Sequence, residues 1–137
     1  MTATFRGTFT EAGTKTVTVE FVEVATGTVL GSKDIAATVA AANSKPVAAN
    51  QGPTSVTVGT TYSLDLSTIF TDADSDAMTY SLVSYTTAEL SPSLVDGKTV
   101  TYTPSTNDAG KTVIITVKAN DGKEDSANVT ITLTVNS

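Results

Sequence analysis

The sequence predicts an all-β protein whose antiparallel strands pack as a sandwich. β-Branched threonine and valine are abundant, and such side chains suit a pleated, half-buried surface better than a helix. Apolar and polar residues alternate with a period of two along most of the chain. Turn residues separate these runs about every eight to twelve positions, the spacing typical of a sandwich. No stretch shows a helical period that would compete with this interpretation.

Length and composition favour one full domain together with part of a second. The chain has 137 residues, of which 39% are hydrophobic and 16% are charged. The charged share lies below the roughly one quarter that is usual in soluble domains. A surface rich in threonine, serine and alanine takes the place of the missing charges.

Charge and residue types exclude several classes of function. The net charge of −6 repels phosphates and anionic lipids, so we expect no nucleic-acid partner and no direct membrane insertion. No apolar stretch is long enough to span a bilayer. The chain contains no cysteine and no histidine, which excludes disulfides, thiolate nucleophiles and the common zinc sites.

The sequence pattern of residues 1–44 predicts a small three-stranded β unit. Glycine-containing turns at residues 11–13 and 25–28 separate its strands. Three strands bury too little apolar surface to fold alone with confidence, so we expect this unit to belong to a preceding repeat or to pack on the following residues. Because strand-like sequence follows Met1 directly, we expect a fragment of a longer chain whose export signal lies outside it. The predicted strands are Phe5–Thr10, Thr16–Phe21 and Val29–Val39, the last interrupted near Gly31.

A change of composition at residues 42–53 marks a boundary. Pro46 and Pro53 lack backbone donors and disfavour regular ladder pairing. We therefore predict an extended, semi-rigid linker between two β units.

Residues 45–137 predict a sandwich of seven short strands. The dipeptide Asp96-Gly97 is a favoured hairpin turn, and Pro104 ends the strand that follows it. For residues 67–70 we expect a short helical or irregular turn that closes one end of the core. The predicted strands lie at residues 55–58, 62–66, 78–82, 94–95, 100–102, 113–117 and 129–135.

Several short motifs in this second unit resemble a known family. They are Lys45–Val47, Ile69–Leu82, Val100–Pro104, Asp108–Gly110 and Val117–Gly122. Together they resemble the bacterial cadherin-like domains of the dystroglycan type, which are relatives of the immunoglobulin-like sandwich. Residues 9–19 resemble the closing strands of another immunoglobulin-like repeat. The resemblance implies an immunoglobulin/cadherin-like sandwich over about residues 45–136.

The strongest candidate for a chemical site is an acidic loop. Asp72, Asp74 and Asp76 could offer oxygen ligands to a hard cation such as calcium. The loop is not an EF-hand, because the positions that require glycine and glutamate hold Ala77 and Val83. The other interpretation is that the aspartates cap turns through their own backbone.

The resemblance extends the candidate calcium site. It implies that Asp121 joins Asp72 and Asp74 as a ligand, helped by Asn50. Calcium-binding cadherin repeats also use a glutamate from the first strands and an acidic linker. Residues 54–61 contain no glutamate and the linker around Lys45 lacks acids. The predicted metal residues are Asp72, Asp74, Asp76 and Asp121.

No catalytic arrangement stands out in the sequence. The acidic loop has no apolar pocket nearby to raise the pKa of one carboxyl group, and no serine or threonine has a histidine as a base. The strand period predicts that Tyr62, Tyr80 and Tyr102 belong to the core and that Tyr85 is exposed. We therefore predict that the protein is not an enzyme.

The predicted function is structural. The leading hypothesis is a spacer or adhesive stalk repeat of a secreted or cell-surface bacterial protein, with neighbouring immunoglobulin-like repeats of the same chain as its partners. One alternative is a module that binds carbohydrate or a surface protein through loops at one end of the sandwich. The other alternative is an immunoglobulin-like decoration domain of a phage virion.

Overall fold

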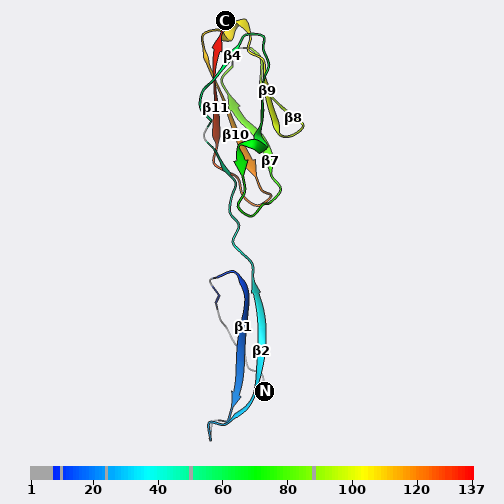
Figure 1. The fold of residues 1–137 in the computed structure, drawn as a ribbon, viewed down its shortest axis with the longest axis vertical. Helices are drawn as coiled ribbons and strands as arrows, with labels where there is room; N and C mark the ends of the chain where they lie inside the picture. Colours follow the sequence, from blue (N-terminus) through cyan, green and yellow to red (C-terminus); the bar gives the residue numbers. More distant parts are fainter. Residues whose placement is uncertain (1–7, 10, 24, 50, 88) are drawn as a thin grey trace. The chain divides into compact units, whose positions relative to one another are not determined.

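The chain forms two compact units, residues 1–42 and residues 43–137 (Figure 1). The computed structural model describes residues 8–9, 11–23, 25–49, 51–87 and 89–137. Every regular element in this described part is a β-strand or a three-residue 3-10 turn. The predicted all-β class is therefore confirmed.

Unit 1, residues 1–42, contains one antiparallel hairpin. It consists of β1 (Gly13–Val22) and β2 (Val29–Val39). The turn between them includes Gly27, whose φ of 73° favours glycine. The strand predicted at Phe5–Thr10 lies largely outside the described residues.

The hairpin corrects one detail of the predicted strands. We expected an interruption of β2 near Gly31; β2 runs without a break, but Phe21 pairs with Gly31 and Val22 pairs with Val29, so Leu30 of β2 is left without a partner in the ladder. Gly31 lies opposite Phe21, directly beside this bulge. A glycine within a strand commonly marks such a bulge.

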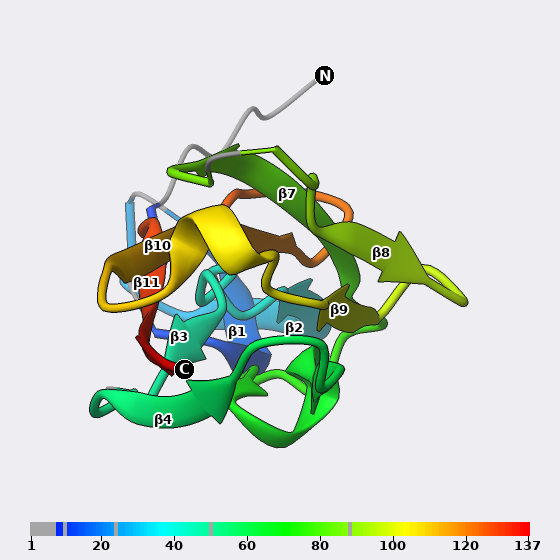
Figure 2. The same ribbon diagram turned by 90° about the horizontal axis from the view of Figure 1, so that it is seen from above.

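Unit 2, residues 43–137, consists of two main sheets. In Figure 2, β8 and β9 lie on one side of unit 2, and β10 and β11 lie on the other. Strand β4 runs parallel to β11, and the other pairs are antiparallel. The first sheet contains, in spatial order, β4 (Thr54–Thr57), β11 (Val129–Asn136), β10 (Thr112–Asn120) and β7 (Thr79–Tyr85). The second contains β5 (Tyr62–Asp65), β9 (Thr99–Tyr102) and β8 (Ser93–Val95).

Alternate residues of the first sheet form the core of unit 2. Val113 pairs with Leu133 and Ile115 pairs with Ile131, so these side chains share one face of the β10–β11 hairpin. The facing layer supplies the fully buried Val100 and the nearly fully buried Tyr102. The core also includes Val56, Leu66, Ile69, Phe70, Val117, Ala119 and Val135.

A short helical turn closes one end of this core, as the sequence predicted. It is η1 (Leu66–Thr68), in which Leu66 is fully buried. Asp65 caps the turn, because its Oδ1 accepts hydrogen bonds from the backbone N and the Oγ of Ser67. Its Oδ2 lies 3.0 Å from Lys98 Nζ. The hydrogen bonds from Ser67 and from Lys98 hold the pKa of Asp65 at about 2.

A buried hydrogen-bond network fixes the corner between the two sheets. The hydroxyl of Tyr102 donates to Oδ2 of Asp108, at 2.7 Å. The same oxygen accepts from the backbone N and the Oγ of Ser105, and this box caps η2 (Thr106–Asp108). Burial, and then the bond to Asp108, raise the pKa of Tyr102 above its usual range. The tyrosine predictions are confirmed as well: Tyr62 and Tyr80 pack against the core, and Tyr85 is exposed.

The predicted linker at residues 42–53 is wrong in part. β3 (Val47–Ala48) pairs with β6 (Phe70–Thr71), and Pro46 is buried. These residues therefore belong to the sandwich rather than to a connector. The assignment of residues 1–44 to a preceding repeat stays a prediction.

Truncating a core side chain of β11 should destabilise unit 2. We expect Leu133→Ala to lower the free energy of unfolding by about 3 kcal/mol, because it removes buried methyl groups and leaves a cavity. Urea denaturation measures this change. The control Leu90→Ala, at a side chain that is 51% exposed, should cost much less. Equal losses in the two variants would contradict the described core.

The cap at Asp65 should make stability depend on pH. Its lowered pKa stabilises the fold above its unfolded-state pKa, and this contribution is lost as the pH falls from about 4 to about 2. Asp65→Asn keeps an acceptor for Ser67 but cannot titrate. Urea titrations between pH 7 and pH 2 should show a smaller decline for Asp65→Asn than for the unmodified chain. Parallel declines would contradict the assigned role of Asp65.

Candidate functional site

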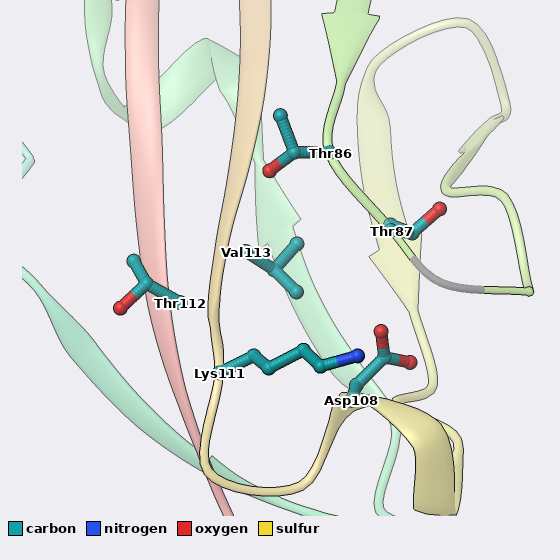
Figure 3. Close-up of a pocket in the computed structure, with 6 residues that line it drawn as sticks. All are labelled: Thr86, Thr87, Asp108, Lys111, Thr112 and Val113. Carbon is teal, nitrogen blue, oxygen red and sulfur yellow. The ribbon is translucent and has the colours of Figure 1, made fainter.

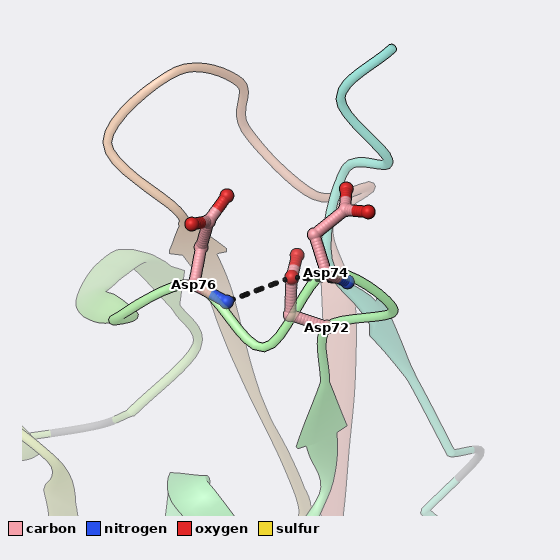
Figure 4. A group of neighbouring side chains, drawn as sticks. All are labelled: Asp72, Asp74 and Asp76. Atoms are coloured by element: carbon pink, nitrogen blue, oxygen red, sulfur yellow. Dashed lines mark hydrogen bonds between the residues drawn. The ribbon is translucent and has the colours of Figure 1, made fainter. Parts of the chain in front are cut away.

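The acidic loop that connects β6 with β7 brings three carboxylates together. One ligand oxygen from each of Asp72, Asp74 and Asp76 lies within 4.8 Å of the others. Asp74 is exposed, and the other two are half-buried. Figure 4 shows the three side chains on this loop. The spacing of alternate aspartates in the sequence therefore does produce a cluster of carboxylates.

Asp72 organises the backbone of its own loop. Its Oδ1 accepts hydrogen bonds from the backbone N of Asp74, at 2.9 Å, and of Asp76, at 3.1 Å (Figure 4). Ser75 between them has a φ of 61°, which few residues other than glycine adopt. Side-chain capping of this kind stabilises a tight turn. Turn capping therefore accounts for the role of one carboxylate oxygen of Asp72, Oδ1.

The other two aspartates join the loop to neighbouring segments of unit 2. Asp74 Oδ2 accepts a 2.6 Å hydrogen bond from the backbone N of Ser44. Asp76 Oδ2 forms a 2.7 Å ion pair with Lys123 Nζ. Through these two contacts the loop holds the first residues of unit 2 and the turn that follows β10.

Asp121 lies in that turn, outside the three-carboxylate cluster. Its Oδ1 accepts from the backbone N of Lys123 and Glu124, and its Oδ2 accepts from Nδ2 of Asn43. The backbone bond from Glu124, followed by the bond from Asn43, holds the pKa of Asp121 at about 2. The carboxylate is therefore ionised and shaped to cap its turn.

Two buried oxygens at this end of the sandwich lack a hydrogen-bond partner among the described residues. They are Oδ2 of Asp72 and Oδ1 of Asn43. Buried acceptors without a donor are uncommon, and a hard cation takes oxygen ligands of this kind. Nδ2 of Asn43 also donates to Oε2 of Glu124, at 3.3 Å. Calcium at Asp72, Asp74, Asp76 and Asp121 stays a prediction, and Asn50 lies outside the described residues.

One surface pocket of unit 2 is lined mainly by polar side chains, several of which take part in structural hydrogen bonds. A pocket of about 280 Å³ lies beside the start of β10 (Figure 3). Its Asp108 is engaged by Tyr102 and Ser105, and its Thr86 accepts from the backbone of Ile114. Neither histidine nor cysteine occurs in the chain to serve as base or nucleophile. The pocket is lined by Thr86, Thr87, Asp108, Lys111, Thr112 and Val113.

Comparison with known proteins identifies the family. A family model described as a bacterial Ig domain matches residues 43–134, which cover nearly all of unit 2. The chain belongs to the bacterial Ig domain family. Domains of this family are typically found in surface or extracellular proteins. The described part of the chain contains no helix that is long and apolar enough to cross a membrane.

Solved structures show the same fold within a larger enzyme. The endo-fucoidan hydrolase MfFcnA4 from glycoside hydrolase family 107 matches 93% of this bacterial Ig chain with a TM-score of 0.53 and 20% identity. A variant of that enzyme matches the same share with a TM-score of 0.52. The chain spans 19% of each of these structures, so the likeness shows the fold alone. No curated protein matches the chain.

Two substitutions at Asp72 should separate turn capping from cation binding in this bacterial Ig domain. In chelator, we expect Asp72→Ala to lower the free energy of unfolding by about 1–2 kcal/mol, because two backbone amides lose their acceptor. Asp72→Asn keeps that acceptor and should cost less. Thermal melts of all three proteins in chelator and in calcium measure both effects.

The thermal melts in calcium test the predicted ligands. A cation bound only to the folded state raises the melting temperature of the unmodified chain. That rise should be absent in Asp72→Asn, which lacks the charge. Equal melting temperatures in calcium and chelator would contradict the calcium prediction and leave Asp72 as a turn cap.

Proposed function

We propose that this bacterial Ig domain is a non-catalytic spacer repeat of a secreted or cell-surface protein. The observation that carries the proposal is the closed, mainly apolar interior of unit 2, whose surface pockets contain no histidine or cysteine among the described residues. Such a unit offers separation and stiffness rather than chemistry. Its partners are neighbouring Ig-like repeats of the same chain.

The strand order suits a unit that carries tension. β4 and β11 are parallel neighbours, and their register pairs Thr54 with Leu133 and Thr57 with Asn136. β4 is the first strand of the main sheet, and β11 is the last strand of the chain. A pull on the two ends of unit 2 therefore loads the hydrogen bonds of this pair together, in shear. β3 precedes β4 along the chain and pairs with β6. A pull on the first residues of unit 2 therefore acts on the β3–β6 pair before it acts on the β4–β11 pair.

The surface charge fits an exposed repeat. The net charge of −6 keeps the protein soluble and disfavours adhesion to nucleic acid or anionic lipid. In unit 2 the acids are largely engaged in caps and ion pairs, as Asp65, Asp76 and Asp121 illustrate. They support loops rather than forming one strongly charged binding patch.

A carbohydrate-binding module is the second candidate function. Hydroxyl groups line the pocket beside β10, and a second pocket of about 200 Å³ includes Ser91, Ser93 and Tyr102. The fold also occurs within a structure titled as an endo-fucoidan hydrolase. Against this candidate, Tyr102 is 2% exposed and cannot stack on a sugar.

A glycan array that includes fucoidan tests the spacer proposal. We expect no saturable binding by the 137-residue chain at concentrations up to about 100 μM, because carbohydrate sites need convergent polar groups in a well-formed pocket. A saturable hit would contradict the pure spacer proposal. If that hit were lost in Lys111→Met, which removes a donor at nearly constant volume, the binding would belong to the pocket beside β10.

A further inference from the structure

The hairpin of unit 1 has one apolar face and one polar face. Val17 and Ile35 are paired across the strands and share a face with Val19 and Phe21. The opposite face carries residues such as Thr18, which donates to Asp34 at 2.6 Å. The apolar face is defined as Val17, Val19, Phe21, Ile35 and Val39; Lys15 and Lys33 lie on the same side, opposite Ala37 and Val19.

This apolar face is largely uncovered. The exposed fractions are 40% for Val17, 54% for Phe21 and 51% for Ile35, and Val19 is the one buried hydrophobic residue described in unit 1. The sheet of unit 1 has two strands, so both strands also present free edges in the described part. A two-stranded hairpin is at best marginally stable in water without a covering layer. The face therefore requires an occupant.

The closing hairpin of unit 2 has the same design. Ala12-Gly13-Thr14-Lys15-Thr16-Val17 parallels Ala109-Gly110-Lys111-Thr112-Val113, with one additional residue after the glycine. From the shared Lys-Thr-Val onward, Val17, Val19 and Phe21 occupy the positions of Val113, Ile115 and Val117. The pairing agrees, because Val17 lies opposite Ile35 as Val113 lies opposite Leu133.

The two hairpins differ in what covers them. Val113, Ile115 and Val117 are no more than 1% exposed, because the sheet of β5, β9 and β8 packs over them. Hydrogen-bonded neighbours also occupy both edges of that hairpin: β7 pairs with β10, and β4 pairs with β11. The same sequence pattern in unit 1 has none of these neighbours among the described residues.

We propose that the apolar face of β1 and β2 is the docking surface for the second sheet of an Ig-like sandwich. The occupant is a β-layer with alternating apolar side chains, of the kind that β5, β9 and β8 provide in unit 2. This layer belongs to the same polypeptide, at the length that the source organism produces. It also adds one strand to each free edge of the hairpin. The hairpin is then the closing pair of strands of a complete Ig-like domain. This inference is independent of the spacer role of unit 2.

A second copy of the hairpin fits this face poorly. Two strands of about ten residues, with a rise of ~3.4 Å per residue and a spacing of ~4.8 Å, present about 330 Å². Stable interfaces bury roughly 800 Å² on each partner. Lys33 lies on the same side of the hairpin, opposite Val19, so two copies face to face would also bring lysines together. A covering sheet avoids this repulsion between lysines if it ends before Lys33 or places an acidic side chain beside Lys33.

Site-specific thiol labelling tests the proposal, because the chain has no native cysteine. Phe21→Cys and Val17→Cys report on the apolar face, and Thr16→Cys is the matched control on the opposite face. We expect all three thiols to react at similar rates in the 137-residue chain. In the protein at the length that its source makes, Phe21→Cys and Val17→Cys should react at least tenfold more slowly, and Thr16→Cys should be unchanged.

Three results would overturn the proposal. Equal labelling at both lengths would show that no sheet covers the face. Equal slowing of all three thiols would show burial without a preferred face. Slow labelling of the 137-residue chain, together with a dimer in sedimentation velocity, would assign the face to a second copy. Because two different positions report on the face, misfolding of one variant does not decide the outcome.

Discussion

The structure of unit 2 depends on the burial of one face of the β10–β11 hairpin. Val113, Ile115 and Leu133 point to one side of this hairpin, and the residues between them on the other side are threonines except for the exposed Ile114. Each such side chain contributes about 1.5–3 kcal/mol when it is fully buried. That gain is available only if a second layer covers the face, and the sheet of β5, β9 and β8 provides it. The corner at Tyr102 and Asp108 and the plug at Leu66 then close the ends of the same interior.

The proposed function rests on where polar side chains gather in unit 2. The clusters of carboxylates described above lie in the loops at the ends of the sandwich. The loop at Asp72 uses its carboxylates to connect residues 44, 72–76 and 123 within unit 2. The family match over residues 43–134 agrees with a unit whose main property is a stable, closed shape. The proposed spacer role would use this shape to separate and orient other elements.

Much of the fold could be predicted from the sequence, since turn chemistry and the period of two are local signals. Asp96 and Gly97 both adopt positive φ, as their dipeptide predicted. The pairing of β3 with β6 could not be predicted, because two-residue strands beside Pro46 have no measurable period. Likewise, the partners of Asp121 come from residues 43 and 123–124, and the first of these contacts depends on the tertiary fold. The period of the unit 1 hairpin predicted an apolar face but could not show whether anything covers it.

Hydrogen exchange of the monomeric 137-residue chain tests most directly whether a covering layer decides the stability of each hairpin. If it does, the amides of β10 and β11 exchange only through global unfolding of unit 2, whereas the amides of β1 and β2 exchange at least a hundredfold faster. The two hairpins have strands of comparable length, 10 and 11 residues in unit 1 and 9 and 8 in unit 2, and share a sequence pattern, so the comparison reports the effect of the covering sheet and the edge strands. Equal protection of both hairpins in the monomer would contradict this account.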